Sequence, residues 1–398
     1  MKKSSNRIFR FGNRYLVAFL AFLGAFAPIS TDMYLPALPS MAINLHTSND
    51  MVAASISLFM LSFAISMLFW GALSDKYGRR PVLFAGLALY VISSAAIALA
   101  ESIWPLLFWR CVQAIGSGAV CSLSLAIVKD IMRGERMEKM VGIMQAATVL
   151  APLTAPLIGG VMLLWTSWRG IFWCLALCGL LALLGVFALA ETSPKKREIS
   201  LLATFGRMGF VLRNRHFRNP LLLFSAMSMP FFSYLATSAF IYQDGFGLDA
   251  QVYSLFFALN ASCSLLGPLS FIYWLRHYPR NRVITAQLAA ISLFGFALLF
   301  FGSLGPWWFA LLFAPITYCG SALRPPSTVL MMTANEGDNG IVASLISCGG
   351  LLGGSLSMFV ATLGIWANPV FAVGTIAVVV AGIGLLFWLK IKGEYSKQ

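Results

Sequence analysis

Residues 71–81 read Gly-Ala-Leu-Ser-Asp-Lys-Tyr-Gly-Arg-Arg-Pro and lie between two long apolar stretches of the chain. Within this short stretch, one acidic residue, Asp75, is followed by Lys76, Arg79 and Arg80. A helix needs about 20 apolar residues to cross the hydrocarbon core of a bilayer. A short charged segment between two apolar runs of that order is typical of a loop between two membrane-spanning helices. The stretch therefore predicts a helical protein that crosses a membrane more than once.

The rest of the chain agrees with this interpretation. Of 398 residues, 59% are hydrophobic and 11% are charged, whereas about a quarter of the residues of a soluble domain are charged. Apolar runs such as 16–29 and 171–190 do not alternate in polarity as barrel strands do. We predict an all-α polytopic membrane protein with twelve transmembrane helices, near residues 15–35, 51–73, 82–100, 104–128, 140–163, 169–190, 220–242, 251–274, 283–303, 306–331, 340–363 and 368–390.

The net charge of +14 is explained by membrane topology. All Lys and Arg residues except Arg110, Arg169 and Arg324 precede the first predicted span or follow the second, fourth, sixth, eighth and last. Loops rich in Lys and Arg lie on the cytoplasmic side. Both termini are therefore predicted to be cytoplasmic, with the lipid bilayer as partner and no nucleic acid.

The residues give no sign of a cofactor or of covalent chemistry. The three His residues lie in loops far apart in sequence, and the seven Cys residues lie within predicted spans without metal-ligand spacing. No phosphate-binding loop occurs, and no nucleophile and base stand together within a span. We predict no cofactor, no metal site and no enzymatic activity.

The chain divides near its midpoint. The longest hydrophilic stretch, residues 191–219, follows the sixth predicted span, and residues 77–82 resemble residues 278–283 at the same loop of the second half. We predict a six-helix bundle at 1–190, a cytoplasmic linker at 191–219 and a second six-helix bundle at 220–398. Paired repeats of this kind are the usual build of secondary transporters, which bind substrate between the repeats.

Residues 71–81 closely resemble the cytoplasmic loop signature of the major facilitator superfamily. The resemblance implies a gate latch formed by Gly71, Asp75, Gly78, Arg79 and Arg80. In physical terms, Gly71 permits close helix approach, Asp75 and Arg79 can pair, and Gly78 allows an unusual backbone turn. The alternative is a solvated basic loop that only fixes topology.

In the fourth predicted span, Arg110, Gln113, Gly116 and Gly118 resemble the arginine and glycine motif of the same superfamily, with Ala114 where glycine is more usual. An arginine within a span costs about 2.5–3.5 kcal/mol, so it normally faces a cavity or a partner. Asp32 in the first span lies at a compatible depth, and we predict that it is the partner of Arg110.

Asp32 belongs to Thr-Asp-Met-Tyr-Leu-Pro-Ala-Leu-Pro at residues 31–39, which is similar to the first-helix motif of the twelve-span drug–proton antiporters. The resemblance extends over the whole chain and is closest to their bicyclomycin-resistance (Bcr/CflA) branch. Burial of a carboxylate favours its neutral form and a nearby arginine its charged form, so access to water can switch its protonation. Asp32 and Arg110 are therefore the predicted proton-coupling residues; the alternative for Asp32 is a helix cap.

Residues 151–160 in the fifth predicted span resemble the motif that marks antiporters in this superfamily, with Ala155 where glycine is usual. Two prolines, Pro152 and Pro156, weaken the helix, and the pair Gly159 and Gly160 allows close contact. We expect these four residues to belong to the gate and to pack against a helix of the other half. A plain kinked helix is the alternative.

In the second half, Arg324 is followed by Pro325 and Pro326 inside a predicted span, which marks a broken helix. Arg324 is either a cavity residue or an anchor whose side chain extends to the membrane surface. Polar, aromatic and sulfur-containing side chains suit the binding of varied compounds. The candidate substrate-binding residues are Tyr34, Gln113, Met144, Tyr234 and Arg324.

The resemblance implies a monomer in the bacterial inner membrane that exports small drugs in exchange for protons by alternating access. One alternative keeps the fold and changes the cargo to a dedicated metabolite such as an amino acid or sugar. The two alternatives of another class are a membrane-embedded enzyme and a channel.

Overall fold

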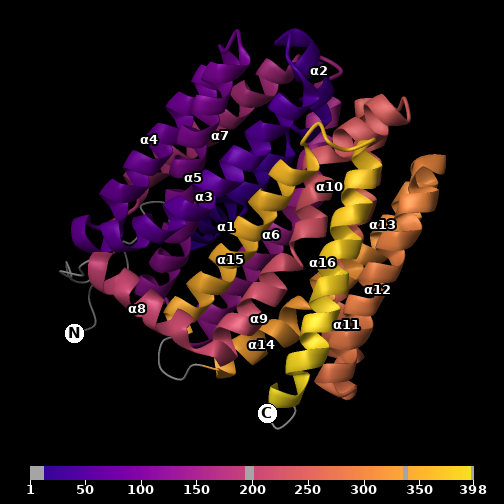
Figure 1. Ribbon diagram of the computed structural model, residues 1–398. Coiled ribbons are helices and arrows are strands. Elements are labelled where there is room, and N and C mark those ends of the chain that lie inside the picture. Colours follow the sequence, from indigo (N-terminus) through magenta and orange to yellow (C-terminus); the bar gives the residue numbers. More distant parts are fainter. Residues whose placement is uncertain (1–12, 193–200, 335–338, 396–398) are drawn as a thin grey trace. The chain divides into compact units, whose positions relative to one another are not determined.

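The computed structural model describes residues 13–192, 201–334 and 339–395. The basic residues before residue 13, Lys195 to Arg197 in the predicted linker, and Lys397 lie outside these ranges. Within the described residues the structure is helical throughout (Figure 1). The chain divides into two compact units, residues 1–47 with 61–204, and residues 48–60 with 205–398.

The first unit contains the helices of the first six predicted spans. Their bounds are α1 (Asn13–Asp32), a short 3₁₀ turn (Leu35–Ala37), α2 (Leu38–Asn44), α3 (Asn49–Tyr77), α4 (Arg79–Ala98), α5 (Ile103–Ile131), α6 (Glu135–Met162) and α7 (Trp168–Ala188). The beginning of α3 is grouped with the second unit. There, Asn49 Nδ2 donates a hydrogen bond of 2.8 Å to Asp244 Oδ2.

The second unit contains the helices of the last six predicted spans. Their bounds are α9 (Arg215–Ala226), α10 (Met229–Ala239), a π-helical turn (Phe240–Gly245), α11 (Ala250–Tyr273), α12 (Arg280–Phe301), α13 (Pro306–Ala322), α14 (Arg324–Thr333), α15 (Asn339–Ala361) and α16 (Pro369–Ile391). Short 3₁₀ turns follow α11, α12 and α16, at Leu275–His277, Gly302–Leu304 and Lys392–Tyr395. The predicted linker at 191–219 contains α8 (Leu201–Arg213) and the first residues of α9.

The same pairs of spans pack together in each unit. Helix α1 lies along α6, and α4 lies between α5 and α7. In the second unit, α10 lies along α15, and α12 lies between α13 and α16 (Figure 1). These are the first and fifth, third and fourth, and third and sixth spans of each six-helix set. The packing therefore repeats along the chain as the loop sequences do.

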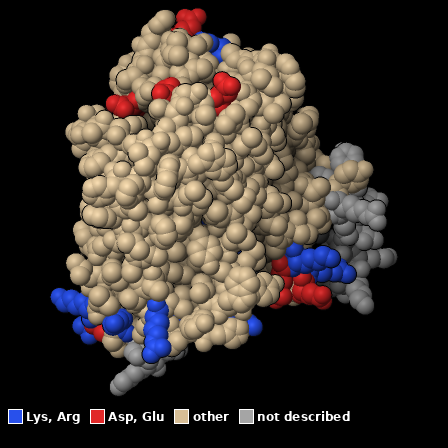
Figure 2. Space-filling model, turned by 90° about the vertical axis from the view of Figure 1, so that its right-hand side faces the viewer, with Lys and Arg blue, Asp and Glu red and all other residues tan. Residues whose placement is uncertain are grey.

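Eleven helical segments among the described residues are long and apolar enough to cross a membrane. On the face shown in Figure 2, the Lys and Arg side chains gather mainly at the lower end, and most of the surface between the ends is uncharged. An uncharged middle with charge at the ends is what a bilayer requires of a spanning protein. The predicted fold class, a helical polytopic membrane protein, is confirmed.

The tenth predicted span, 306–331, is not one helix. It is divided into α13 and α14, which meet at Leu323. The prolines at 325 and 326 supply no backbone N–H to the helical ladder, which separates the two helices. Helix α13 alone has 17 residues, which is at the lower limit of the length needed to cross a bilayer.

Candidate functional site

Two spans at corresponding positions of the two units are interrupted. The first span breaks after Asp32, where α1 ends before the 3₁₀ turn at Leu35–Ala37. The seventh breaks between α9 and α10, at Met227 and Ser228. Interrupted spans at matching places in two repeats mark the binding region of secondary transporters. Both breaks therefore point to candidate site residues.

A buried arginine organises the polar interior of the first unit. The Arg110 side chain, on α5, is fully buried. Its Nη2 donates a hydrogen bond of 3.0 Å to Tyr34 Oη, and its Nη1 donates to Gln113 Oε1 and to the Ser30 carbonyl. The guanidinium carbon lies 4.4 Å from the centre of the Tyr34 ring and 5.7 Å from that of Phe172. Hydrogen bonds and aromatic faces together offset the loss of hydration.

The network continues through hydroxyl groups on α1 and α4. Gln113 Nε2 donates to Ser94 Oγ at 2.7 Å. The hydroxyl groups of Ser30 and Tyr90 lie 2.6 Å apart. Helices α1, α4 and α5 are thus joined by side-chain hydrogen bonds around Arg110. Since the alternative to each bond is an unsatisfied polar group away from water, the network fixes these helices relative to one another.

Asp32 lies at the end of α1, two residues before Tyr34. It is 4% exposed, and its Oδ1 accepts a hydrogen bond of 2.9 Å from the Thr31 hydroxyl. Arg110 is held by residues on either side of Asp32, Ser30 and Tyr34. The ion pair of Asp32 with Arg110 stays a prediction.

Helix α6 packs on α1 immediately beside this site. A Cβ added to Gly159 would lie 1.8 Å from the Met33 carbonyl oxygen, so no larger residue fits there without movement. Thr148 Oγ1 donates to the Gly24 carbonyl at 3.0 Å, and Met144 contacts the same glycine. This close contact of Gly159 is made within its own unit, and packing of α6 against a helix of the other half stays a prediction. Pro152 and Pro156 lie inside α6, which is helical from Glu135 to Met162.

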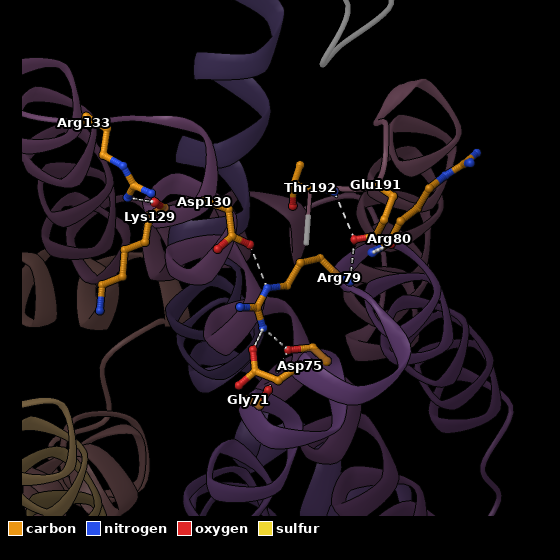
Figure 3. A network of polar contacts seen from close by, with 10 residues as sticks. Gly71, Asp75, Arg79, Arg80, Lys129, Asp130, Arg133, Glu191 and Thr192 are labelled. Atoms are coloured by element: carbon orange, nitrogen blue, oxygen red, sulfur yellow. Dashed lines mark hydrogen bonds and ion pairs between the residues drawn. The ribbon is translucent and has the colours of Figure 1, made fainter. Parts of the chain in front are cut away.

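The loop between α3 and α4 carries a second polar network. Arg79 reaches between two acids: its Nη1 lies 2.7 Å from Asp75 Oδ1, and its Nε lies 2.9 Å from Asp130 Oδ2 on α5 (Figure 3). It also donates to Ser74 Oγ. The predicted pair of Asp75 and Arg79 is therefore present. Asp130 extends this pair to a third helix.

Glu191, just beyond α7, connects the end of α7 to the start of α4. Its two carboxylate oxygens accept hydrogen bonds of 2.9 and 3.1 Å from the backbone N–H groups of Arg79 and Arg80, at the start of α4. The Arg80 side chain in turn donates to the carbonyls of Val186 and Phe187, at the end of α7. An acid at a helix start and a cation at a helix end are both favoured by the helix dipole.

Gly78 makes this arrangement possible. Its φ is 105°, and an added Cβ would lie 2.6 Å from Glu191 Oε2. Only glycine combines this backbone conformation with room for the carboxylate. At Gly71, by contrast, an added Cβ would meet no atom of the described residues within 4 Å. The close helix approach expected at Gly71 stays a prediction.

The second unit contains a cavity of about 370 Å³. Arg324, at the start of α14, lines it together with residues of α9 to α13 and α15, including Met227 and Ser228 at the break of the seventh span. The structure thus places Arg324 in a cavity wall.

Tyr234 does not line this cavity. It is 1% exposed, and its ring stacks on that of Phe313 with centres 4.4 Å apart, between further rings from Phe257 and Phe309. Its hydroxyl is buried without a hydrogen-bond partner among the described residues. Tyr234 belongs to an aromatic core of α10, α11 and α13.

The structure thus distributes the predicted site residues over separate places. Tyr34, Gln113 and Arg110 lie together in the first unit. Met144, on α6, contacts α1 at Gly24. Tyr234 and Arg324 lie in different parts of the second unit. Sequence reasoning missed Asp130 and Glu191. The available signal was weak: each is an acid at the end of a span whose neighbouring loop contains more basic than acidic residues.

Comparison with known proteins shows the family to which the chain belongs. The family model of the Major Facilitator Superfamily matches residues 20–336. An uncharacterized MFS-type transporter of Bacillus subtilis, YdgK, is 33% identical over 289 residues, covering 70% of this chain and 71% of that protein. The multidrug resistance protein MdtL of Escherichia coli is 29% identical over 310 residues, covering 72% and 77%.

Solved structures show the same fold. A peptide transporter POT in complex with sulfate superposes with a TM-score of 0.77 at 16% identity, covering 99% of this chain and 97% of that one. The human organic anion transporter MFSD10 gives a TM-score of 0.66 at 19% identity, covering 94% and 99%. The chain belongs to the Major Facilitator Superfamily and is a multi-pass membrane transporter of that family, not an enzyme.

Proposed function

We propose that this protein is a proton-coupled exporter of small drugs that works by alternating access in the bacterial inner membrane, as a monomer with both termini in the cytoplasm. The similarity to MdtL, which is named a multidrug resistance protein, supports the proposal that small drugs are the cargo. The first-helix motif at residues 31–39 supports assignment to the bicyclomycin-resistance branch of the drug–proton antiporters.

The observation that carries the proposal is Asp32. It is a buried carboxyl group at the point where α1 is interrupted, next to the network of Arg110. A coupling site needs a group that gains and loses a proton as its access to water changes. One proton moving down one pH unit supplies about 1.4 kcal/mol, enough for tenfold accumulation of one exported molecule. In this mechanism, proton binding from outside at Asp32 releases the drug outward.

The loop network supplies the conformational part of the mechanism. Asp75, Arg79 and Asp130 join the ends of α3, α4 and α5, and Glu191 with Arg80 joins α4 to α7. In this mechanism the charged cluster acts as a latch, in which Asp75 with Arg79 and Arg80 stabilises the outward-facing arrangement. Gly159 and Gly160 with Pro152 and Pro156 let α6 follow α1 as the substrate site opens.

Efflux from everted membrane vesicles, with and without a pH gradient, tests the proposal. Native protein is expected to export ethidium only with the gradient, and Asp32→Asn at equal membrane abundance is expected to lose this dependence. Asp249→Asn, which changes an exposed acid at the start of α11, is the matched control. Normal gradient-driven efflux by Asp32→Asn would contradict the proposed role of Asp32.

A dedicated metabolite exporter of the same fold is the second candidate. The cavity of the second unit favours it, because several Ser and Thr residues line its wall beside Arg324. Hydroxyl groups and a guanidinium in a pocket fix the orientation of a polar ligand, which suits a dedicated metabolite. Competition experiments with a panel of unrelated drugs separate the two: a drug exporter is inhibited by many of them, and a metabolite exporter by very few.

A further inference from the structure

Among the described residues around the cavity of the second unit, one side chain carries a formal charge. Among the described residues that line its volume of about 370 Å³, Arg324 is the one basic residue, and none is Asp or Glu. The ion pairs within 4.0 Å in the described part of the chain do not include Arg324, and its side chain has no hydrogen-bond partner there. The residue is nevertheless exposed to solvent, and it lines a cavity.

The absence of a side-chain partner among the described residues distinguishes Arg324 from Arg110 and Arg79. Arg110 is fully buried, and its two Nη atoms donate hydrogen bonds to Tyr34, Gln113 and a backbone carbonyl. Arg79 is neutralised by two acids. A charged group inside a spanning segment is costly unless it faces water or a partner. Arg324 faces a space in which a ligand can be that partner.

The positive character of this place comes from the side chain, not from the helix start. Arg324 is the first residue of α14, but Pro325 and Pro326 follow it and offer no N–H groups. The first N–H of α14 beyond the prolines, that of Ser327, donates to the Leu323 carbonyl. An anion here would therefore bind to the guanidinium, which offers a planar pair of donors suited to a carboxylate.

The rest of the wall supplies hydroxyl donors and apolar surface. Thr317 Oγ1 is buried without a hydrogen-bond partner among the described residues, so its donor is available to a ligand. Phe231, Phe232 and Met331 supply apolar surface in the same cavity. The volume is at the small end of the range of about 300–1,000 Å³ for drug-sized ligands. The cavity fits one small amphipathic molecule.

We propose that this cavity is the subsite for the acidic group of the exported compound, so that the cargo includes small aromatic organic acids. Arg324 binds the carboxylate, the Thr317 hydroxyl donates to it, and the aromatic rings hold the apolar body. This proposal rests on the exporter function proposed above and specifies the class of its substrate.

A pair of compounds that differ only in charge tests this subsite. Equilibrium dissociation constants are measured for 2-naphthoate and 2-naphthamide with the full-length protein purified in detergent, and for phenylacetate and phenylacetamide as a second pair. Native protein is expected to bind at least one acid about tenfold more tightly than its amide, which corresponds to about 1.4 kcal/mol. Equal affinity within both pairs, or no binding of either acid, overturns the proposal.

Variants of Arg324 show whether the preference arises there. Arg324→Gln is expected to weaken binding of the acid about tenfold and to leave the amide within about twofold, and the retained amide binding shows that the variant is folded. Arg324→Lys is expected to be intermediate because it keeps the charge and loses the planar donor pair. The matched control is Arg276→Gln, which removes an exposed arginine outside the cavity. Unchanged acid affinity in Arg324→Gln overturns the proposal.

Vesicle efflux separates this proposal from the exporter function. If native protein binds 2-naphthoate through Arg324 but shows no gradient-driven efflux of any compound, the exporter function fails and the subsite stands. If vesicles export ethidium normally while the acids have no advantage over the amides, the exporter function stands and the subsite is wrong.

Discussion

Glu191 Oε1 accepts a hydrogen bond of 2.9 Å from the backbone N–H of Arg79, a residue 112 positions earlier in the chain. Through this contact the end of the sixth span caps the start of the third. The same Arg79 pairs with Asp75 and Asp130 through its side chain. The loop signature is therefore one part of a cluster that joins four helices of the first unit.

Replacing Glu191 by Ala removes both hydrogen bonds at the start of α4. We expect a loss of about 0.5–2 kcal/mol in the free energy of unfolding, the usual effect of deleting a helix cap. Thermal unfolding of the purified protein measures it. Glu101→Ala, which changes an exposed acid in a loop, is the control. Equal stability of the two variants would show that the cap contributes nothing.

Gly78→Ala is expected to disturb the contact between the Glu191 carboxylate and the start of α4. The φ of 105° lies in a region essentially restricted to glycine, and the new Cβ would lie 2.6 Å from Glu191 Oε2. The backbone strain alone costs about 1–3 kcal/mol. Gly71→Ala, inside α3 and with no described atom within 4 Å of the new Cβ, is expected to gain about 0.5–1 kcal/mol from helix propensity.

A double-mutant cycle links these two changes. Once Gly78→Ala has displaced the Glu191 carboxylate, Glu191→Ala removes fewer contacts. The double variant should therefore lose less unfolding free energy than the sum of the losses of the two single variants. Full additivity in thermal unfolding would mean that the strain at Gly78 and the cap at Glu191 are independent.

The spans were predictable because they are local: apolar length and the positions of Lys and Arg are visible in the sequence. The contacts of Glu191 and Asp130 were not, because each joins segments far apart in the chain, and the sequence does not give the direction of a side chain at a helix end. Pro325 and Pro326 predicted a broken helix in the tenth span. The structure shows two separate helices there, α13 and α14, which meet at Leu323.

The candidate site was predicted in part. Arg110 in a span had to have partners, and Gln113, three residues on, lies on the same helix face. The sequence did not predict that the Ser30 carbonyl and the Tyr34 hydroxyl accept hydrogen bonds from Arg110. Both groups come from a distant segment of the chain, and contacts between distant segments produce no periodic pattern in the sequence. Seven helices line the cavity beside Arg324, so the sequence alone does not show that its described lining residues include no acid.

Substitutions at Tyr34 separate its two contacts with Arg110. Tyr34→Phe keeps the ring 4.4 Å from the guanidinium and removes the hydroxyl that accepts its hydrogen bond. Hydrogen bonds to charged groups contribute about 1.5–3 kcal/mol, so we expect a loss of that order in unfolding free energy. Tyr34→Leu should lose a further 0.5–2 kcal/mol or so because the aromatic face is also gone. Tyr278→Phe, at an exposed tyrosine, is the control; a loss there as large as at Tyr34 would contradict this assignment.

Two glycines of α6 provide a matched test of the packing beside Asp32. Gly159→Ala would place a methyl group 1.8 Å from the Met33 carbonyl oxygen, so α1 and α6 must separate. We expect a loss of about 1–3 kcal/mol, as for other overpacked interiors. Gly142→Ala lies on the same helix with no atom within 4 Å and should gain about 0.5–1 kcal/mol from helix propensity alone. Because Met33 follows Asp32, gradient-dependent efflux should fall in Gly159→Ala and not in Gly142→Ala. A stable, fully coupled Gly159→Ala protein would show that close contact between α1 and α6 at this point is not required for transport.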